Sequence, residues 1–565
     1  MEKTKTNYFA NSNDVENSRK IDIEKAHNTN HSKMIQNYIF SKRINSNFPF
    51  NQKIQNSNNI MPDKFNSNLI VKNIEEILII FNKIENITPF NQIKETYVIK
   101  NTLLEKLKEI RKELSKENIS MEETKSIFND KTQTFICGLL CKDSFDSFMQ
   151  VESLWIINNF MFLAAKYKYC ISFDVKNISN ILIQYFINII KSQKNEGVKY
   201  TLEEKILRIF GNIIYINNNV IELLINNNII TFIVDSLNSP VSSFRITCLW
   251  LINKIIVNLK KLEGINYMNL FYTKNAFLNY KFILSRLDNL SSFDEIGELF
   301  WLFNELVKYD PTILAIVFFS DLGDKNNHNE ICLNKELALK NYELVLNNCL
   351  SNKMFQTSFR LISNLLIVCF NIVKNEDLSS ELINILFEKQ GFIRFIDDVL
   401  NSPKNKYETP LVKDILLLIF NLICLSKIKS SILFKKGIIN LINDINYQND
   451  NEIMKLLFFM YYRILAANAF LFEPNDEKVI KVCLILLERF KDDISIMIIF
   501  IDIFYFYLKA SHIKISDDIE NEIKAMASCE QNTQNIPIEK YQFVLIKLTN
   551  SIKLHSPLSV FMKNI

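Results

Sequence analysis

The stretch QVESLWIINNF, residues 150–160, contains a tryptophan and an asparagine that could act together on a ligand. Trp155 and Asn159 are four residues apart, so on a helix they lie one turn apart on the same face. An indole ring can hold the aliphatic stem and the charge of a Lys or Arg side chain. A side-chain amide both donates and accepts, so it can hold the backbone of an extended peptide. The pair therefore indicates a peptide-binding surface, with packing in a helical core as the alternative.

The same spacing recurs in five other apolar stretches of the chain. Aligned with Trp155 and Asn159, these stretches contribute the pairs Arg208 and Asn212, Trp250 and Lys254, Trp301 and Glu305, Arg360 and Asn364, and Leu417 and Asn421. We call the place of Trp155 in this alignment the Trp position. All three Trp residues of the chain occupy it, at separations of 95 and 51 residues, which are close to two repeats and one. Independent core residues would not be expected to keep such a spacing, so we predict a repeated surface.

Residues suited to catalysis or metal binding form no recognised motif. The chain has no GxxxxGK[ST], GxGxxG or GxSxG sequence, and none of its 5 His residues lies near a candidate nucleophile. Cys137 and Cys141 are four residues apart, which we interpret as two small apolar residues on a buried helix face rather than as metal ligands. His27 and His31 fall in a polar segment where no helix is expected to hold them. The sequence therefore predicts a protein without catalysis, cofactor or metal.

The composition indicates long helices and an intracellular location. The 565 residues include only 8 Gly and 10 Pro, so sharp turns should be few. The formal net charge of +4 is small for this length and does not favour a nucleic-acid-binding protein. The 10 Cys residues form no CxxC pair, and no secretory signal is recognisable, which indicates a reducing compartment inside the cell.

The most membrane-like segment is ISIMIIFIDIFYFYL, residues 494–508. It is shorter than the roughly 20 residues that a membrane-spanning helix needs, and Asp502 lies in its middle. We therefore predict a buried helix in this segment and no membrane contact.

The chain changes character along its length. Residues 1–68 are rich in Asn and mildly basic, with little apolar periodicity, which predicts a disordered arm. The following stretches NLIVKNIEEILIIFNKI and YVIKNTLLEKLKEIRKEL have apolar residues at three- and four-residue spacing, so residues 69–125 are predicted to form N-terminal capping helices. Residues 126–510 are predicted to hold about eight repeats, and residues 511–565 to form C-terminal capping helices and a tail.

Repeats of about 46 residues are visible in stretches that begin at residues 226, 389 and 435. Gly391 and Gly437 stand 46 residues apart at equivalent places, with Ile229 as the corresponding landmark in the first stretch. One such unit of three helices cannot bury its apolar face alone, so neighbouring units must stack. Period and helix number match armadillo repeats. We therefore predict an all-α fold, a right-handed superhelical solenoid whose third helices line a concave groove.

The stretch QVESLWIINNF resembles the second-repeat signature of the importin alpha family, the armadillo adaptors of nuclear import. The likeness rests on the Gln, the Glu, and the Trp and Asn four residues apart. EEKILRIFGNI is similar to the following repeat of that family, with Arg208 in place of the Trp. The resemblance covers about residues 70–510 and is strongest between residues 130 and 260. It implies a non-enzymatic adaptor that binds linear cargo peptides, the nuclear localisation signals, in its groove.

In that family, Trp rings form slots for cargo Lys and Arg side chains, and Asn amides hold the cargo backbone. The resemblance implies the following peptide-binding residues: Trp155, Asn159, Asn212 and Trp250 in a principal groove, Asn364 and Asn421 in a second groove, and Trp301 between the two. Arg208 and Lys254 depart from the family, since they place positive charge where a basic cargo side chain would lie. This departure argues against ordinary recognition of basic signals but not against peptide binding.

Two functional hypotheses follow. The first is an importin-alpha-like adaptor of the cytoplasm and nucleus, whose partners are cargo proteins and, through the N-terminal arm, importin beta. The arm has only the basic pairs Arg19-Lys20 and Lys42-Arg43, so a solvated tail without this partner is the alternative. The second hypothesis is an armadillo scaffold for protein assembly that has lost signal recognition. Neither hypothesis involves nucleic acid or a membrane.

Overall fold

The computed structural model describes most of the chain between residues 65 and 425, together with a C-terminal helix. The described residues are 65–85, 92–116, 119–141, 145–167, 174–192, 194–259, 267–287, 293–320, 333–352, 355–388, 409–425 and 538–555, with isolated positions between 394 and 521. Within these residues every regular element is a helix, apart from one antiparallel bridge between Ser320 and Leu333. The predicted all-α class is confirmed for this part of the chain.

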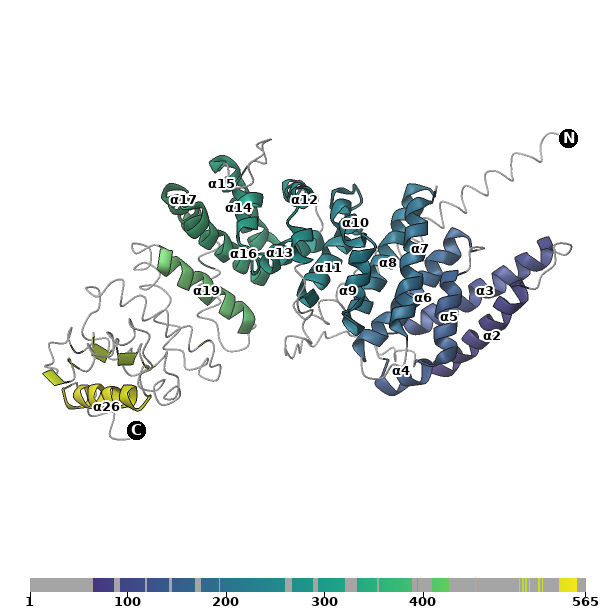
Figure 1. Cartoon of the computed structure of the whole chain (residues 1–565), viewed down its shortest axis with the longest axis horizontal. Helices are drawn as coiled ribbons and strands as arrows, with labels where there is room; N and C mark the ends of the chain where they lie inside the picture. Colours follow the sequence, from purple (N-terminus) through teal and green to yellow (C-terminus); the bar gives the residue numbers. More distant parts are fainter. Residues whose placement is uncertain are drawn as a thin grey trace. The chain divides into compact units, whose positions relative to one another are not determined.

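The chain forms two compact units, residues 1–217 and 218–565, and the first contains two layers of helices. Its described helices are α2 (Ser67–Glu85), α3 (Gln92–Leu114), α4 (Met121–Ile127), α5 (Asp130–Cys141), α6 (Ser147–Lys166), α7 (Val175–Lys191) and α8 (Glu196–Ile216). One layer consists of α3, α6 and α8 packed side by side, and the other of α2, α5 and α7 (Figure 1). The layers are joined where α2 packs on α3, α5 on α6 and α7 on α8.

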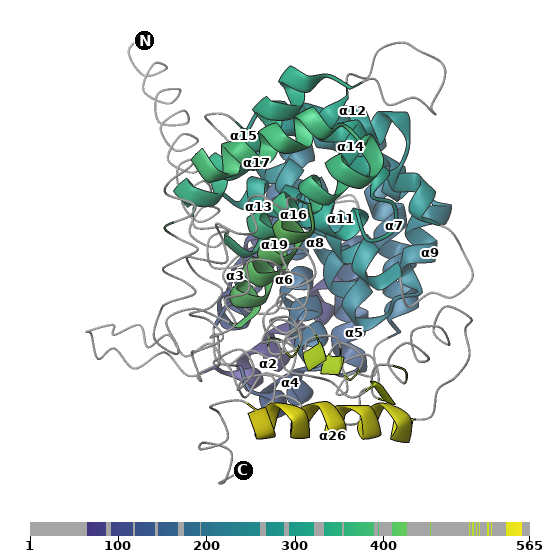
Figure 2. The same cartoon turned by 90° about the vertical axis from the view of Figure 1, so that its left-hand side faces the viewer.

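The second unit repeats the two-layer arrangement. Its described helices are α9 (Val220–Asn226), α10 (Ile229–Asp235), α11 (Ser242–Leu259), α12 (Lys274–Ser285), α13 (Phe293–Leu306), α14 (Thr312–Phe319), α15 (Lys335–Asn352), α16 (Phe355–Val368), α17 (Glu376–Glu388), α19 (Thr409–Leu425) and α26 (Ile538–His555), with short 3₁₀ or π segments at Ser236–Asn238, Tyr267–Phe271 and Cys369–Val373. Helices α11, α13, α16 and α19 pack in succession in one layer. Helices α10, α12, α14, α15 and α17 form the other, as the turned view in Figure 2 also shows for α14, α15 and α17.

Helix α6 carries the Trp155 stretch and is buried around most of its circumference. It lies between α3 and α8 and also touches α5, so polar residues such as Gln150 and Asn158 are buried along with the apolar ones. Its start is fixed by Asp146, whose Oδ1 accepts the backbone N–H of Met149 at 2.9 Å. Because three helices enclose it, α6 needs partners for its polar side chains on the neighbouring helices.

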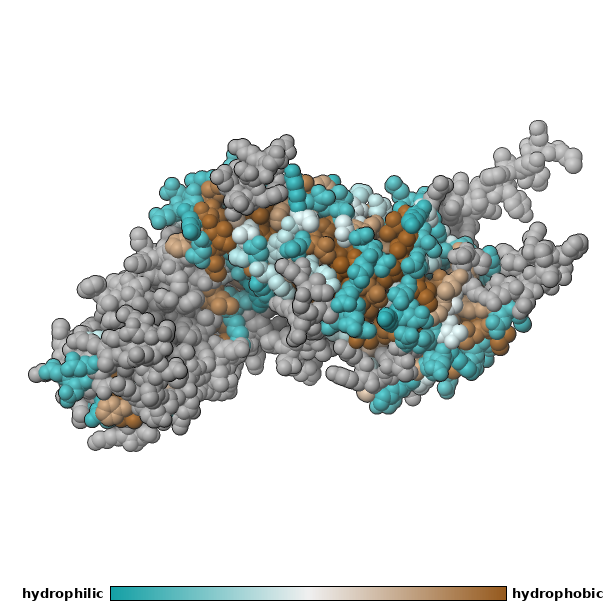
Figure 3. Space-filling model, viewed as in Figure 1, coloured by the Kyte–Doolittle hydropathy of each residue, from teal (hydrophilic) through white to brown (hydrophobic). Residues whose placement is uncertain are grey.

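Apolar side chains fill the space between the two layers of each unit. In the second unit the rings of Tyr280, Phe303 and Phe318 meet edge to face, with centroids 6.0 and 5.1 Å apart. The buried hydroxyl of Tyr280 donates to the backbone oxygen of Phe271 at 3.3 Å. On the face shown in Figure 3, apolar and polar side chains alternate in bands over the described helices, as amphipathic helices produce when one side of each is covered.

The turn between α9 and α10 explains the repeat landmark. Asn228 has a φ of 57°, in the left-handed region that favours Gly and tolerates Asn. In the repeat alignment it stands opposite Gly391 and Gly437, which lie outside the described residues, and one residue before Ile229, where α10 begins. The landmark is therefore Asn228 rather than Ile229, because this turn needs a residue that accepts a positive φ.

The interpretation of the cysteine pair is wrong in part. Cys137 and Cys141 both lie on α5, but Cys141 is exposed and Cys137 is half-buried. The buried face of α5 is formed instead by residues such as Phe135, Ile136 and Leu139. The two thiols therefore lie at the side of that face. His27 and His31 lie outside the described residues.

The apolar segment 494–508 is described only at single positions. Those that are helical and buried are Met497, Phe500, Ile501, Phe504 and Leu508. Apart from the adjacent Phe500 and Ile501, successive positions are three or four residues apart, which agrees with the predicted buried helix. Across the described part of the chain, no single helix has the length and apolar character to cross a membrane, and only the bent pair Val220–Asn226 and Ile229–Asn238, with an angle of 74°, meets those criteria jointly.

Gly138 of α5 tests how closely α5 approaches α2. A Cβ atom at this position would lie 2.8 Å from Cε2 and 3.0 Å from Cδ2 of the buried Phe81 ring on α2. Gly138→Ala should lower the free energy of unfolding by about 1–2 kcal/mol, because the steric overlap outweighs the better helix propensity of Ala. Urea unfolding followed by circular dichroism measures this difference.

Gly197→Ala is the matched control. A Cβ atom there would meet only Oδ1 of Asn195, at an ordinary contact distance of 3.5 Å, in the exposed first turn of α8. This substitution should be neutral or should stabilise the protein by up to about 1 kcal/mol. Equal effects of the two substitutions would contradict the close approach of α5 to α2.

Candidate functional site

The residues at the Trp position lie in one layer of helices within each unit. In the first unit they are on α6 and α8, and in the second on α11, α13, α16 and α19. We call these six the register helices. Trp155, Trp250 and Trp301 are each half-buried, so each ring combines packing within the chain with some accessible surface. Leu417, at the same position on α19, is 43% exposed.

One face of the Trp155 ring is covered by a lysine of the chain itself. The Nζ atom of Lys205, on α8, lies 3.6 Å from the centroid of the Trp155 ring on α6. Lys205 is buried, with 7% of its surface exposed. A cation over an indole face is attractive by about 2 kcal/mol when water is excluded. The place that an incoming cation would take on this face of Trp155 is therefore filled.

Two pairs of arginine and glutamate surround this contact. Nε of Arg111, on α3, lies 2.8 Å from Oε2 of Glu152 on α6. Arg208 donates from Nε and Nη2 to Oε1 of Glu204, one turn earlier on α8, at 3.2 and 3.0 Å. The Arg208 contact consists of charge-assisted hydrogen bonds, which are strong, whereas the Arg111 contact is an ion pair whose two atoms form no hydrogen bond. We call the following residues the Trp155 cluster: Arg111, Glu152, Trp155, Glu204, Lys205 and Arg208.

Burial changes the ionisation of two members of the Trp155 cluster. The pKa of Lys205 falls from 10.5 to about 7, chiefly because burial disfavours the ammonium, although Glu204 and Glu152 attract it. Burial also raises the pKa of Glu152, against the opposing attraction of Arg111 and of Lys205. Lys205, which lies over the Trp155 ring, therefore gains or loses its charge near neutral pH, whereas an ordinary lysine would stay charged.

The predicted peptide-holding amides of the first unit hydrogen bond to neighbouring helices. Nδ2 of Asn159 donates to Oγ of Ser115, the residue that follows the end of α3, at 3.3 Å, and Nδ2 of Asn212 donates to Oδ1 of Asn158 on α6 at 3.1 Å. Asn159 is buried and Asn212 is half-buried. Among the described residues, no hydrogen bond reaches Oδ1 of either side chain. Each amide therefore links two helices with its donor and keeps an acceptor.

In the second unit, a lysine also lies beside Trp250. Nζ of Lys254, one turn further along α11, is 5.8 Å from the ring centroid, and Lys254 is buried. Asn253, the residue before it, donates from Nδ2 to the backbone oxygen and to Oε2 of Glu298 on α13, at 3.0 and 2.7 Å. Trp250 is thus flanked by a cation of its own helix and by a bond to the next register helix.

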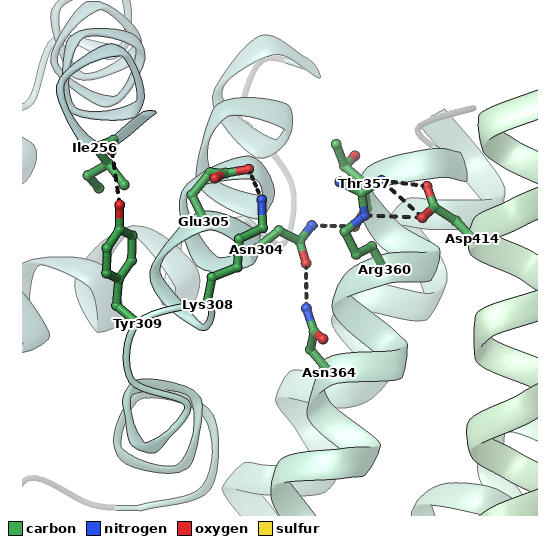
Figure 4. A network of polar contacts seen from close by, with 9 residues as sticks. All are labelled: Ile256, Asn304, Glu305, Lys308, Tyr309, Thr357, Arg360, Asn364 and Asp414. Atoms are coloured by element: carbon green, nitrogen blue, oxygen red, sulfur yellow. Dashed lines mark hydrogen bonds and ion pairs between the residues drawn. The ribbon is translucent and has the colours of Figure 1, made fainter. Parts of the chain in front are cut away.

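Helices α13, α16 and α19 are linked by polar contacts in the same way. In Figure 4, Nδ2 of Asn304 donates to the backbone oxygen of Thr357 at 2.8 Å, while Oδ1 of Asn304 accepts from Nδ2 of Asn364 at 3.0 Å. Further along, Arg360 donates from Nε and Nη2 to the carboxylate of Asp414 on α19, at 3.0–3.1 Å. The predicted residue Asn364 is thus brought next to Asn304, on the helix that carries Trp301.

The asparagine three residues after each Trp is not among the residues predicted from the sequence. All three occurrences are buried: Asn158, Asn253 and Asn304. Each makes a hydrogen bond to the next register helix. The signal was present as a WxxN sequence at every Trp of the chain. The four-residue spacing leads instead to Asn159, Lys254 and Glu305.

The residue three before the Trp position was also missed. On four register helices this residue contacts the preceding register helix, and the contacts are Lys205 with Trp155, Glu298 with Asn253, Thr357 with Asn304, and Asp414 with Arg360. The same offset in all four helix pairs supports the alignment that was read from the sequence. Lys205 could not be singled out, because nothing in its local sequence predicts a contact with a Trp 50 residues earlier.

The side chain of Asn421 lies outside the described residues, so its predicted role has no structural counterpart here. The remaining predicted residues belong to separate units: Trp155, Asn159 and Asn212 to the first, and Trp250, Trp301 and Asn364 to the second. In the part of the chain that the structure describes, no group of three or more His, Cys, Asp or Glu residues is placed to hold a metal ion.

Comparisons with known proteins do not identify a family. No protein-family model matches the chain, and no curated protein matches it. The solved structures to which it is similar include two engineered proteins. One has 13% sequence identity and a TM-score of 0.46, covering 85% of this chain and 99% of that one. The other has 10% identity and a TM-score of 0.33, covering 53% of this chain and 98% of that one.

Asn304 should contribute strongly to stability. Asn304 is buried, and Asn304→Ala removes both its donor to the backbone oxygen of Thr357 and its acceptor for Asn364. We expect the free energy of unfolding to fall by about 2–3 kcal/mol. Asn364→Ala removes one bond at a half-buried site and should cost about 1 kcal/mol or less. Urea unfolding of both variants and of the double variant measures the coupling energy between Asn304 and Asn364. A smaller loss of unfolding free energy for Asn304→Ala than for Asn364→Ala would refute the linking role of Asn304.

Lys205 should make stability depend on pH. In the unfolded chain this lysine has its ordinary pKa of 10.5, but in the folded chain its pKa is about 7. The unfolded state binds more protons between these values, so the contribution of Lys205 to stability rises with pH in this window. The stability of wild type relative to Lys205→Met should therefore increase by roughly 1 kcal/mol per pH unit from pH 7 to 10.

Urea unfolding at a series of pH values measures this slope. Lys131→Met is the control, since Lys131 is exposed and pairs with Glu75 on the surface. Its stability difference from wild type should stay flat over the same range. Parallel profiles for wild type and Lys205→Met would show that Lys205 keeps an ordinary pKa.

Proposed function

We propose that this chain is a non-enzymatic adaptor that holds a linear segment of a partner protein on its register helices. The carrying observation is the placement of half-buried Trp155, Trp250 and Trp301 at the Trp position of three register helices, α6 in the first unit and α11 and α13 in the second. A half-buried indole offers a large, rigid contact surface at low entropic cost, which is why Trp is enriched at binding surfaces. We propose armadillo-like repeats as the architecture, because two layers of helices recur in both units.

The asparagines fit the same role. Asn159, Asn212 and Asn364 each use Nδ2 to link helices, and among the described residues no hydrogen bond reaches their Oδ1 atoms. An acceptor fixed in this way can receive a backbone N–H of an extended peptide without first having to be ordered. The amides would then serve the fold and the ligand together.

Nuclear import is the first form of this proposal. It follows from the resemblance of QVESLWIINNF to the importin alpha signature, with cargo signals as ligands, importin beta as partner of the arm, and the cytoplasm and nucleus as location. The residues proposed to contact cargo are those named from the sequence, with Trp155 and Asn159 foremost.

A protein-assembly scaffold without recognition of basic signals is the second candidate, and a specific observation favours it. Lys205 lies on the ring of Trp155, and Lys254 lies beside that of Trp250. A basic peptide would have to displace these cations or share the rings with them, at a cost in repulsion. A ligand without clustered positive charge meets no such obstacle.

Selection from a displayed library of random linear peptides tests the proposal. Full-length wild type should enrich a family of related sequences, and Trp155→Ala should fail to enrich them because the anchoring ring is lost. Trp155→Phe keeps an aromatic ring and should retain part of the enrichment. Unfolding midpoints of both variants establish that they are folded.

The enriched sequences separate the two forms. Clusters of Lys and Arg would support the import adaptor, and sequences without them would support the scaffold. The proposal of peptide binding fails if wild type enriches nothing, or if Trp155→Ala enriches the same family to the same extent.

A further inference from the structure

The Trp155 cluster contains a buried cation, Lys205, that two carboxylates attract from a distance but that forms no ion pair among the described residues. Arg111 is matched by Glu152 and Arg208 by Glu204, each within 3.0 Å. Among the described residues, Nζ of Lys205 makes neither an ion pair nor a hydrogen bond, and it rests on the Trp155 ring. Burial of a charge without a counterion is costly. The cluster is therefore short of one negative charge when Lys205 is protonated.

Arg111 adds unused donors next to this cation. It faces Glu152 through Nε, and within the described residues no hydrogen bond leaves its Nη1 or Nη2 atoms. Its side chain is 30% exposed, so these groups are within reach of a ligand. Arg111 comes from α3 and Lys205 from α8, and their contacts on α6, Glu152 and Trp155, are three residues apart. Two cationic groups therefore converge on one turn of α6.

We propose that the Trp155 cluster binds an acidic linear segment of a partner protein, and that Lys205 is the residue that selects it. This inference rests on the proposed peptide-binding function and specifies its ligand. A carboxylate of the segment supplies the anion that Lys205 lacks and accepts from Nη1 and Nη2 of Arg111, in the paired geometry that guanidinium and carboxylate favour. A neighbouring apolar side chain of the segment packs on the accessible part of Trp155.

The charge balance opposes a basic segment at this place. When Lys205 is protonated, Arg111, Lys205 and Arg208 carry three positive charges, against two carboxylates that are already paired with the arginines. A lysine or arginine from a partner would find the covered face of Trp155 filled by Lys205. It would add a fourth positive charge to a surface poor in water, where like charges repel strongly.

Binding of a carboxylate should be coupled to uptake of a proton. The groups that face Lys205 are Glu152 and Trp155 from α6, Arg111 from α3, and Glu204 and Arg208 from its own helix. Together with burial they hold its pKa at about 7. An additional anion favours the protonated form and raises that pKa, so at slightly alkaline pH the complex takes up a proton that free protein lacks.

Fluorescence polarisation with the full-length chain tests the inference. Three labelled peptides of equal length are compared. Each contains Leu and Ser in alternation with one further residue type, which is Glu in the first peptide, Gln in the second and Lys in the third. We expect the Glu peptide to bind best, and Lys205→Met to weaken it roughly tenfold or more, since one charge-assisted contact is lost. Lys205→Arg should restore most of the affinity. Lys131→Met, at an exposed lysine of α5, should leave the affinity unchanged.

Calorimetric titration at pH 7.5 in two buffers of different ionisation enthalpy provides a second readout. Wild type should take up a fraction of a proton per Glu peptide bound, and Lys205→Met should take up less. A merely structural role of Lys205 would leave proton uptake unchanged. Trp155→Ala should also weaken binding of the Glu peptide. This second variant locates the binding at the Trp155 cluster even if Lys205→Met folds poorly.

The outcomes separate the two proposals. Binding of the Lys peptide in preference to the Glu peptide overturns the acidic ligand and leaves the peptide-binding function standing. Equal binding of the Glu peptide by wild type, Lys205→Met and Trp155→Ala also overturns it, because the site would then lie elsewhere. Binding of none of the three peptides, together with no enrichment from the random library, overturns both.

Discussion

The pairing of buried polar groups between adjacent register helices is the constraint on which both units depend. Each register helix except an outermost one has a neighbour on either side, so side chains that would be solvated on an isolated amphipathic helix are enclosed. An enclosed amide or guanidinium without a partner costs a few kcal/mol, whereas a matched one costs little. Asn253, Asn304 and Arg360 each meet a partner on the next helix, 45 to 54 residues later. The repeat length of the chain therefore determines where a buried polar residue finds its partner on the next register helix.

The helices and the common Trp position could be predicted from the sequence, because both depend on local periodicity. Residues with apolar neighbours at three- and four-residue spacing form helices wherever they are described, and the contact offset agrees in four helix pairs. The partner of Trp155 could not be predicted, because the contact with Lys205 depends on how α6 and α8 are rotated about their axes. The same holds for Asn158, Asn253 and Asn304, which look like ordinary residues of an Asn-rich chain. Composition bias hid a structural signal that a chain with fewer asparagines would have revealed.

The polar side chains of the register helices have two roles that usually belong to different surfaces of a protein. They must link helix to helix, and under the proposed function the same side chains meet a ligand. Where an amide donates to the next helix and keeps an acceptor, the two roles are compatible. At Lys205 they conflict, since the ammonium stabilises the contact with Trp155 but is itself destabilised by burial. A ligand that relieves this burial cost would gain affinity from energy already stored in the free protein.

The left-handed turn at Asn228 shows how a chain with few glycines can form a turn that needs a positive φ. A residue with a Cβ atom has fewer backbone states in the unfolded chain than Gly, so fixing it in the turn loses less entropy. Asn offsets its unfavourable φ with a short polar side chain. The chain has only 8 Gly in 565 residues, and at the junction of α9 and α10 an Asn adopts the left-handed conformation instead. At Asn228 the smaller entropy loss and the strain of a positive φ therefore oppose each other.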